Sequence, residues 1–156
     1  MAKRFGEAAR RTLERGLARL LRDGAGAVQS GKEDDLHALR IDVKRLRYNL
    51  EFAAPVLGEG AREPLALLAL AQDCLGALAD ADTFARTYAV MLANLPAQSD
   101  LRPGLERLCN DAARERVRAL EAVRALWYGS QGVPYPDKLA ASISAALRSL
   151  SNDDAS

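Results

Sequence analysis

Apolar residues recur with the period of an α-helix through most of this chain, and that period constrains the fold more than any other feature. In the segment 36–52, wound at about 100° per residue, the large apolar side chains form one stripe. The stripe consists of Leu36, Leu39, Val43, Leu46 and Leu50. Turn-forming residues separate the periodic segments, and no segment is a strand candidate. The sequence therefore predicts an all-α fold.

Turn chemistry divides the chain into successive predicted helices. They cover residues 2–22, 34–57, 62–95, 101–128 and 136–150, with turns expected at 23–26 and 30–31 among others. Four amphipathic helices with short loops are typical of an antiparallel four-helix bundle, and the fifth is a short additional C-terminal helix. We expect one domain over residues 1–150 and a disordered polar tail at 151–156.

Several local features of these helices can be predicted. Ser30 or Asp34 is the expected N-cap of the second helix, which Pro55 should kink or end. Gly76 is a candidate kink in the third helix. The expected core side chains of the first helix are Ala9, Leu13, Leu17, Leu20 and Leu21, and those of the third are Leu65, Leu68, Leu75, Leu78 and one side of Phe84.

Four cationic or potentially cationic residues share one edge of the second helix. His37, Arg40, Lys44 and Arg47 lie within an arc of about 80° beside the apolar stripe. These groups repel one another unless solvent, carboxylates or a polyanion offsets the repulsion. Arginine suits phosphate because its guanidinium donates two parallel hydrogen bonds. The net charge of +1 hides this grouping by face, and the pattern predicts an anion-binding surface.

The same run resembles a known family. Residues 37–52 read H-x-x-R-x-x-x-K-R-L-R-Y-x-L-E-F and closely resemble the signature of the CHAD family, the conserved-histidine α-helical domain. Residues 72–80 resemble the family's Q-D-x-L-G-x-L-N-D element, with Ala79 in place of the usual Asn, and Trp127 is in keeping with the family. The resemblance implies binding of inorganic polyphosphate in a basic cavity between two homologous helical halves. The signature occurs once, so we expect either a stand-alone half that forms a homodimer or a fragment of a longer protein.

The candidate polyphosphate-binding residues are the four cationic residues on one edge of the second helix, which we call the cationic row, their neighbours, and arginines of the first and fourth helices. They are His37, Arg40, Lys44, Arg45, Arg47, Tyr48, Arg11, Arg15, Arg19, Arg114 and Arg118. The first-helix arginines either form a solvated face that pairs with Glu7 and Glu14 or contribute to anion binding. The fourth-helix arginines extend a basic wall only if the bundle turns them toward the second helix.

Alternatives stay open for individual residues of the second helix. His37 is either a ligand of the anion or a capping or surface residue. Arg45 either brackets the anion or faces solvent, and Tyr48 either donates its hydroxyl to phosphate or packs over arginine stems. Glu51 is expected to orient Arg47 through an i,i+4 pair.

Catalysis has little support in the sequence. There is no phosphate-cradling glycine loop, no His-Asp relay and no carboxylate cluster for a two-metal hydrolase. Asp73 and Asp80 are expected to pair with second-helix arginines, where Gly76 permits close helix approach, and they lack the further ligands of a metal site. We therefore expect a binding module without enzyme activity, metal or cofactor. The alternative is a helical protein-interaction module that pairs with an acidic partner, and nucleic acid is an unlikely partner because few aromatics accompany the basic residues.

Composition and the first residues of the chain indicate where in the cell the protein is expected. With 49% hydrophobic and 28% charged residues and no long apolar run, the sequence predicts a soluble domain without a membrane partner. Charged residues near the start argue against a signal peptide. The expected location is the cytoplasm, with polyphosphate granules as a candidate site of association. Cys74 and Cys109 match no metal or redox spacing, which favours reduced thiols over a disulfide.

Overall fold

The computed structural model describes residues 2–129 and 132–152, and the side chains of 4–129 and 132–148. Its elements are α1 (Ala2–Ser30), α2 (Glu33–Leu57), the short 3-10 helix η1 (Gly58–Ala61), α3 (Arg62–Asn94), α4 (Arg102–Tyr128) and α5 (Tyr135–Asn152). Every element of the described chain is helical, so the all-α prediction is confirmed. The first two residues of the expected disordered tail belong to α5, and residues 153–156 lie outside the described part.

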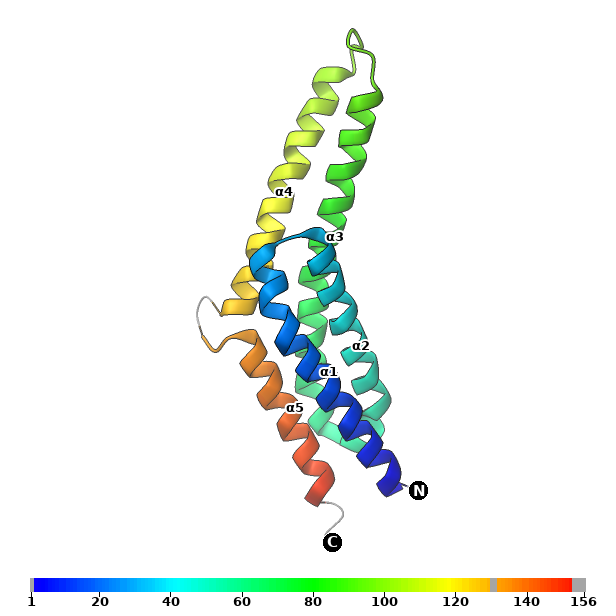
Figure 1. Ribbon diagram of the computed structural model, residues 1–156, viewed down its shortest axis with the longest axis vertical. Coiled ribbons are helices and arrows are strands. Elements are labelled where there is room, and N and C mark those ends of the chain that lie inside the picture. The colour runs from blue at the N-terminus through cyan, green and yellow to red at the C-terminus, as the bar shows by residue number, and fades with distance from the viewer. Residues whose placement is uncertain (1, 130–131, 153–156) are drawn as a thin grey trace.

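The helices form a bundle from which one helical hairpin projects (Figure 1). At one end α1, α2, α5, the first half of α3 and the second half of α4 pack around a common apolar core. We call this part the base. Residues 83–115, which comprise the second half of α3, the connecting loop and the first half of α4, extend beyond it as an antiparallel pair that we call the arm. The chain begins, and α5 ends, at the end of the molecule opposite the arm tip.

The turn expected at residues 23–26 is wrong, because α1 continues through it to Ser30. Gly24 is buried, and a Cβ atom there would lie 2.3 Å from two atoms of the Trp127 ring. The glycine therefore makes room for an indole of α4. The chain turns after the end of α1, at Gly31. Its φ of +63° suits a residue without a Cβ. The turn expected at residues 30–31 is confirmed.

Neither expected residue is the N-cap of α2. Lys32 holds that position without a side-chain hydrogen bond, whereas the Ser30 hydroxyl donates to Asp35 Oδ2 at 2.6 Å. Three carboxylates in the first turn, Glu33, Asp34 and Asp35, complement the helix dipole instead of a cap. Pro55 lies in the last turn of α2, and α3 is continuous through Gly76.

The core follows the predicted stripes with one exception. Leu13, Leu20, Leu68, Leu75 and Leu78 are buried, and Ala9, Leu17, Leu21 and Leu65 pack against them in part. Phe84 is 55% exposed, so its predicted burial is wrong. The reason is that α3 has already left the base at that residue, and its ring stacks only on Tyr88, with centroids 6.2 Å apart.

One apolar stretch qualifies the expectation about membranes. The run Glu33–Asn94 includes an 18-residue window that is long and apolar enough, by length and composition alone, to cross a membrane. The expectation that no stretch reaches that length was therefore too strict. This window is weak evidence for a membrane span, because helices that pack in a soluble core pass the same test.

Candidate functional site

Grooves border α2 on both flanks. The one lined by Arg15, Arg19 and Arg45 is called the α1–α2 groove. A neighbouring groove on the same flank, nearer the start of α2, is lined by Arg22 and the carboxylates of Asp23, Asp35 and Asp42. The α2–α3 groove has a volume of about 320 Å³ and the α1–α2 groove about 240 Å³. The buried stripe of α2 faces the core between them, so its polar residues divide between the two flanks. The predicted site residues must therefore be assigned groove by groove.

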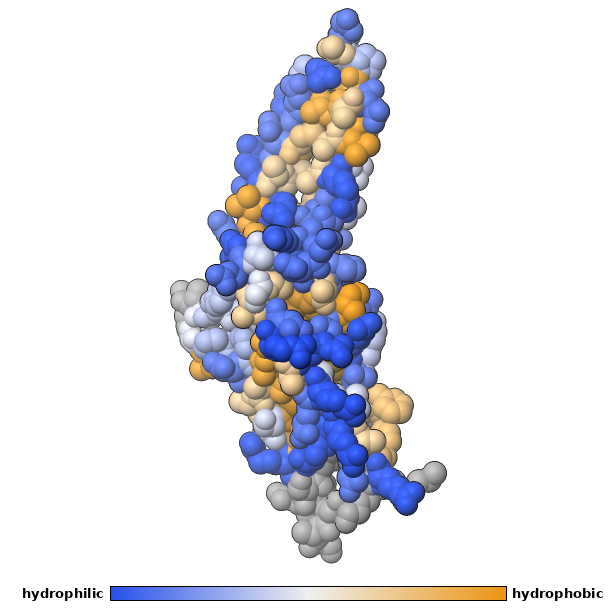
Figure 2. Space-filling view, in the orientation of Figure 1, coloured by the Kyte–Doolittle hydropathy of each residue, from blue (hydrophilic) through white to orange (hydrophobic). Residues whose placement is uncertain are grey.

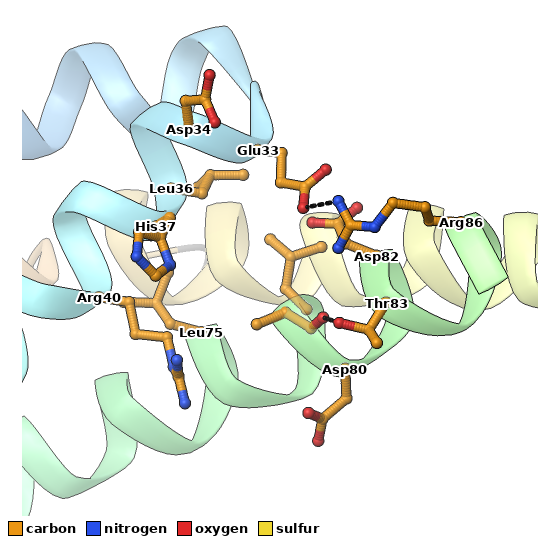
Figure 3. A pocket seen from close by; sticks show the side chains of 12 residues that line it. Glu33, Asp34, Leu36, His37, Arg40, Leu75, Asp80, Asp82, Thr83 and Arg86 are labelled. Atoms are coloured by element: carbon orange, nitrogen blue, oxygen red, sulfur yellow. Dashed lines mark hydrogen bonds and ion pairs between the residues drawn. The ribbon is translucent and has the colours of Figure 1, made fainter.

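The α2–α3 groove contains His37 and Arg40, which leave α2 on the side facing α3 (Figure 3). The groove also has four carboxylates. They belong to Glu33, Asp34, Asp80 and Asp82. Glu33 accepts a hydrogen bond from Arg86 at 2.6 Å. The end of this groove nearest the arm is thus acidic, and the cation it contains is already paired.

The arginine at the far end of the row is held by its neighbours. Arg47 Nε donates to Glu51 at 2.9 Å, and Nη1 donates to the side-chain oxygen of Gln72 at 3.0 Å. The expected pair with Glu51 is confirmed. Gln72 was missed as a partner of Arg47, although its place in the Q-D segment drew attention to it. Two acceptors fix the guanidinium against α3 and neutralise part of its charge.

The remaining row residues have no such partners. Within the described residues, His37, Arg40 and Lys44 make no ion pair and no hydrogen bond through their side chains. The Nε of Arg40 is buried and unsatisfied, which costs free energy unless a ligand or solvent supplies an acceptor. His37 is exposed and Lys44 is half-buried. Tyr48 is 54% exposed, so its two interpretations remain open.

Three other predicted residues lie together, but on the opposite flank. Arg15, Arg19 and Arg45 line the α1–α2 groove. Arg19 lies 3.7 Å from an oxygen of Asp42. Arg45 therefore does not bracket an anion held at His37 and Arg40. Arg11 is outside this groove and pairs with Glu7 at 3.6 Å, as the solvated-face interpretation expects.

The predicted arginines of α4 lie apart from the α2 row. Arg114 pairs with Asp111, and Arg118 pairs with Glu115 at 3.5 Å, all on the same helix. The packing of α4 is mainly along α3. The condition under which these arginines would extend a basic wall beside α2 is not met.

The expected pairing of third-helix carboxylates is wrong in its choice of residues. Within the described chain, neither Asp73 nor Asp80 makes an ion pair, and a Cβ on Gly76 would meet nothing within 4 Å, so that glycine is not a close-packing site. The paired carboxylate is Asp82, whose side chain is 7% exposed and accepts from Arg116 Nε at 2.5 Å. Asp82 is in phase with the buried stripe of α3, at i+7 from Leu75, and that signal could have identified it.

Arginines of α4 also satisfy the end of α1. Arg124 donates to the carbonyl oxygens of Val28 at 3.2 Å and Gln29 at 3.1 Å, and Arg116 donates to that of Gly31 at 3.1 Å. The last carbonyls of a helix lack intrahelical donors, so these contacts fasten the α1–α2 turn to α4. Sequence reasoning did not single out either arginine.

The groups available for other chemistry are few. The described residues include no group of three or more His, Cys, Asp or Glu side chains placed to hold a metal. Cys74 and Cys109 are half-buried free thiols, so the preference for reduced cysteines over a disulfide is confirmed. Burial, together with the neighbouring Asp73, raises the pKa of the Cys74 thiol, which makes it a weak nucleophile at neutral pH.

One comparison with known proteins identifies a family for the part of the chain that forms α1, α2 and most of α3. A family model described as the CHAD domain matches residues 2–89, more than half of the chain, which covers α1, α2 and most of α3. No curated protein and no solved structure matches. CHAD domains are associated with polyphosphate binding in general. The chain belongs to the CHAD domain family.

Proposed function

We propose that this chain binds inorganic polyphosphate in the cytoplasm through the cationic row of α2, and thereby tethers or targets protein to the polymer without catalysing a reaction. The row comprises His37, Arg40, Lys44 and Arg47. The observation that carries the proposal is that His37, Arg40 and Lys44 have no partner among the described residues, whereas most arginines of α1 and α4 have a carboxylate or carbonyl partner. Membership of the CHAD family supports the same ligand.

The row suits a linear polyanion. His37 and Arg47 are ten residues apart, about 15 Å along the axis at the rise of an α-helix. A polymer lying along this edge can therefore contact several cationic groups at once. Each phosphate contact forms a charge-assisted hydrogen bond and offsets the repulsion between neighbouring cationic side chains. The unsatisfied Nε of Arg40 would gain an acceptor.

The test is a matched pair of triple variants. Arg40→Gln, Lys44→Gln and Arg47→Gln together should weaken binding of long-chain polyphosphate about a hundredfold, because several charged hydrogen bonds are lost. Arg107→Gln, Arg114→Gln and Arg118→Gln together remove the same formal charge from the exposed face of α4 and should leave affinity nearly unchanged. Binding should also fall steeply with salt, since each neutralised phosphate releases counterions. Equal losses in the two triple variants would contradict the proposal, because affinity would then depend on net charge and not on the cationic row.

A second candidate function is a helical protein-interaction module with an acidic partner. The exposed apolar surface of the arm favours a protein partner, since Phe84, Met91 and Leu108 are 55%, 52% and 46% exposed, and the cationic row of α2 is the feature that would select an acidic one. Such surface is typical of protein contacts. Competition separates the two functions: polyglutamate should displace labelled polyphosphate poorly if the phosphate geometry is recognised, and equally well if only negative charge is.

We further propose that two copies of the chain recreate the two halves of a complete domain, with their cationic rows facing one another. Repulsion between the rows opposes assembly, so a bridging polyanion should strengthen dimerisation. Light scattering with and without long polyphosphate tests this. A monomer that binds with one-to-one stoichiometry under both conditions would contradict it.

A further inference from the structure

The α1–α2 groove differs in charge from the groove that contains His37. Its lining has three guanidinium groups, from Arg15, Arg19 and Arg45, and one carboxylate, from Asp42. The α2–α3 groove has the opposite balance, because its four carboxylates outnumber Arg40 and Arg86 even with His37 added. The neighbouring groove on the α1 flank contains Arg22 and the carboxylates of Asp23, Asp35 and Asp42, so the excess of cationic groups is confined to the groove around Arg15, Arg19 and Arg45. An anion therefore meets a more favourable field there than in the α2–α3 groove.

The positions of the arginines follow from a close helix contact. A Cβ on Gly16 would lie 3.1 Å from Leu46 Cδ1, so the absence of a side chain at Gly16 lets α2 approach α1 at this point. Arg15 precedes this glycine and Arg45 precedes this leucine in the sequence. The two arginines consequently border the contact from opposite helices, and both line the groove between them.

These guanidinium groups have hydrogen-bonding capacity left over. Arg15 uses its Nε to donate to the Arg11 carbonyl at 3.2 Å, which leaves both terminal nitrogens of Arg15 available. Arg45 makes no ion pair within the described residues. The Arg19–Asp42 separation of 3.7 Å is too long for a strong hydrogen bond, and Asn49 adds amide donors to the lining.

We propose that the α1–α2 groove is a second phosphate-binding site, separate from the cationic row of α2, in which Arg15 and Arg45 contact a phosphate-type oxyanion from the two helices. Arg19 and Asn49 complete its donors. Neither arginine touches the α2–α3 groove, so this site does not depend on the proposed role of His37. The oxyanion can be a free small phosphate or one segment of a polymer that continues elsewhere.

The experiment is an NMR titration with tripolyphosphate, followed at groups that report on each flank of α2. The Gly16 backbone amide and the Asn49 side-chain amide report on the α1–α2 groove, and the His37 ring and the Ala79 backbone amide report on the α2–α3 side of the row. Tripolyphosphate should shift both sets. In the double variant Arg15→Gln and Arg45→Gln, affinity measured at Gly16 and Asn49 should fall at least about tenfold, while the His37 response persists. The pair Arg114→Gln and Arg118→Gln is the charge-matched control and should behave as the parent protein.

The outcomes separate this site from the proposed function. Stationary Gly16 and Asn49 signals, with moving His37 and Ala79 signals, would overturn the second site and leave the row intact. The reverse pattern would support the second site and overturn the row. Equal losses at Gly16 in the double variant and in its charge-matched control would also overturn the site, because only net charge would matter. With long polyphosphate, a matching loss in the double variant identifies a polymer segment as the occupant, and an unchanged affinity identifies a separate small phosphate.

Discussion

The two halves of α3 are one continuous helix in two different environments. The first half packs against α2, α5 and η1 and contributes every buried residue of the helix. These are Pro64, Leu68, Ala71, Leu75, Leu78, Ala81 and Asp82. The second half, residues 83–94, buries none in the described structure, and its Arg86 reaches α2 through an ion pair with Glu33. A continuous helix in this protein therefore does not have a continuous buried face.

The exposed surface of the arm agrees with this difference. Strongly and weakly hydrophobic residues lie along the arm in the space-filling view, in an area bordered by hydrophilic side chains (Figure 2). Val90 and Val117 are 56% and 54% exposed. Only Leu105 and Ala112 are buried on the α4 side of the arm. We expect the arm to open locally at lower free energy than the base, since few apolar contacts hold it.

The largest expected effect compares a leucine from each region. Leu68→Ala in the base, where the side chain is fully buried, should lower the free energy of unfolding by about 3 kcal/mol through lost transfer energy and a cavity. Leu108→Ala in the arm, where the side chain is 46% exposed, should cost less than about 1 kcal/mol. Urea denaturation of both variants checks this. Equal costs would mean that the arm has a core of its own or is covered in solution.

A largely buried ion pair, between Asp82 and Arg116, lies at the junction of the two regions. Asp82→Ala leaves Arg116 without its carboxylate, and because Arg116 is about one-third exposed, we expect a loss of about 2 kcal/mol, below that of a fully buried pair. Asp111→Ala removes an exposed carboxylate that pairs with Arg114 and should have no measurable effect. The same denaturation assay, with hydrogen exchange of residues 28–31, tests both variants. Unchanged exchange at that turn in Asp82→Ala would show that Arg116 keeps its bond to Gly31 unaided.

Two glycines of α1 give the third comparison. Gly24→Ala places a methyl group against the Trp127 ring and should destabilise the protein by about 2 kcal/mol through overpacking. Gly26→Ala has nothing within 4 Å and should stabilise it by about 0.5 kcal/mol, because alanine favours the helix. Thermal denaturation followed by the fluorescence of Trp127 measures both. Stabilisation by Gly24→Ala would show that the indole can move aside without cost.

These glycines also show what sequence reasoning can and cannot reach. Periodicity placed the helices and most of the core, because amphipathic stripes are local. It misread Gly24 as a turn, since the Trp127 that fills its space is about a hundred residues away in the chain. Likewise the spacing places Arg45 on the flank of the stripe opposite Arg40, but only the packing of α1 and α3 on the two flanks shows that the two arginines border different grooves.

The smallest expected effect concerns how α5 is fastened to the first half of α3. The buried Tyr135 hydroxyl donates to the Leu67 carbonyl at 3.0 Å, and Tyr135→Phe should cost about 1 kcal/mol at neutral pH. Burial, together with Cys74, raises the pKa of Tyr135 far above its ordinary value of 10.0. The unfolded chain therefore releases this proton near pH 10 while the folded chain keeps it, so stability contributed by the neutral phenol is lost as pH rises above 10. The difference in free energy of unfolding between the parent protein and Tyr135→Phe should accordingly shrink between pH 9 and pH 11, as measured by urea denaturation.

Tyr128→Phe, at a ring that is 51% exposed, is the matched control and should follow the parent protein. A constant difference across this pH range would mean that Tyr135 is not held as a buried, neutral donor and that α5 packs on the base less closely than the contact with Leu67 indicates.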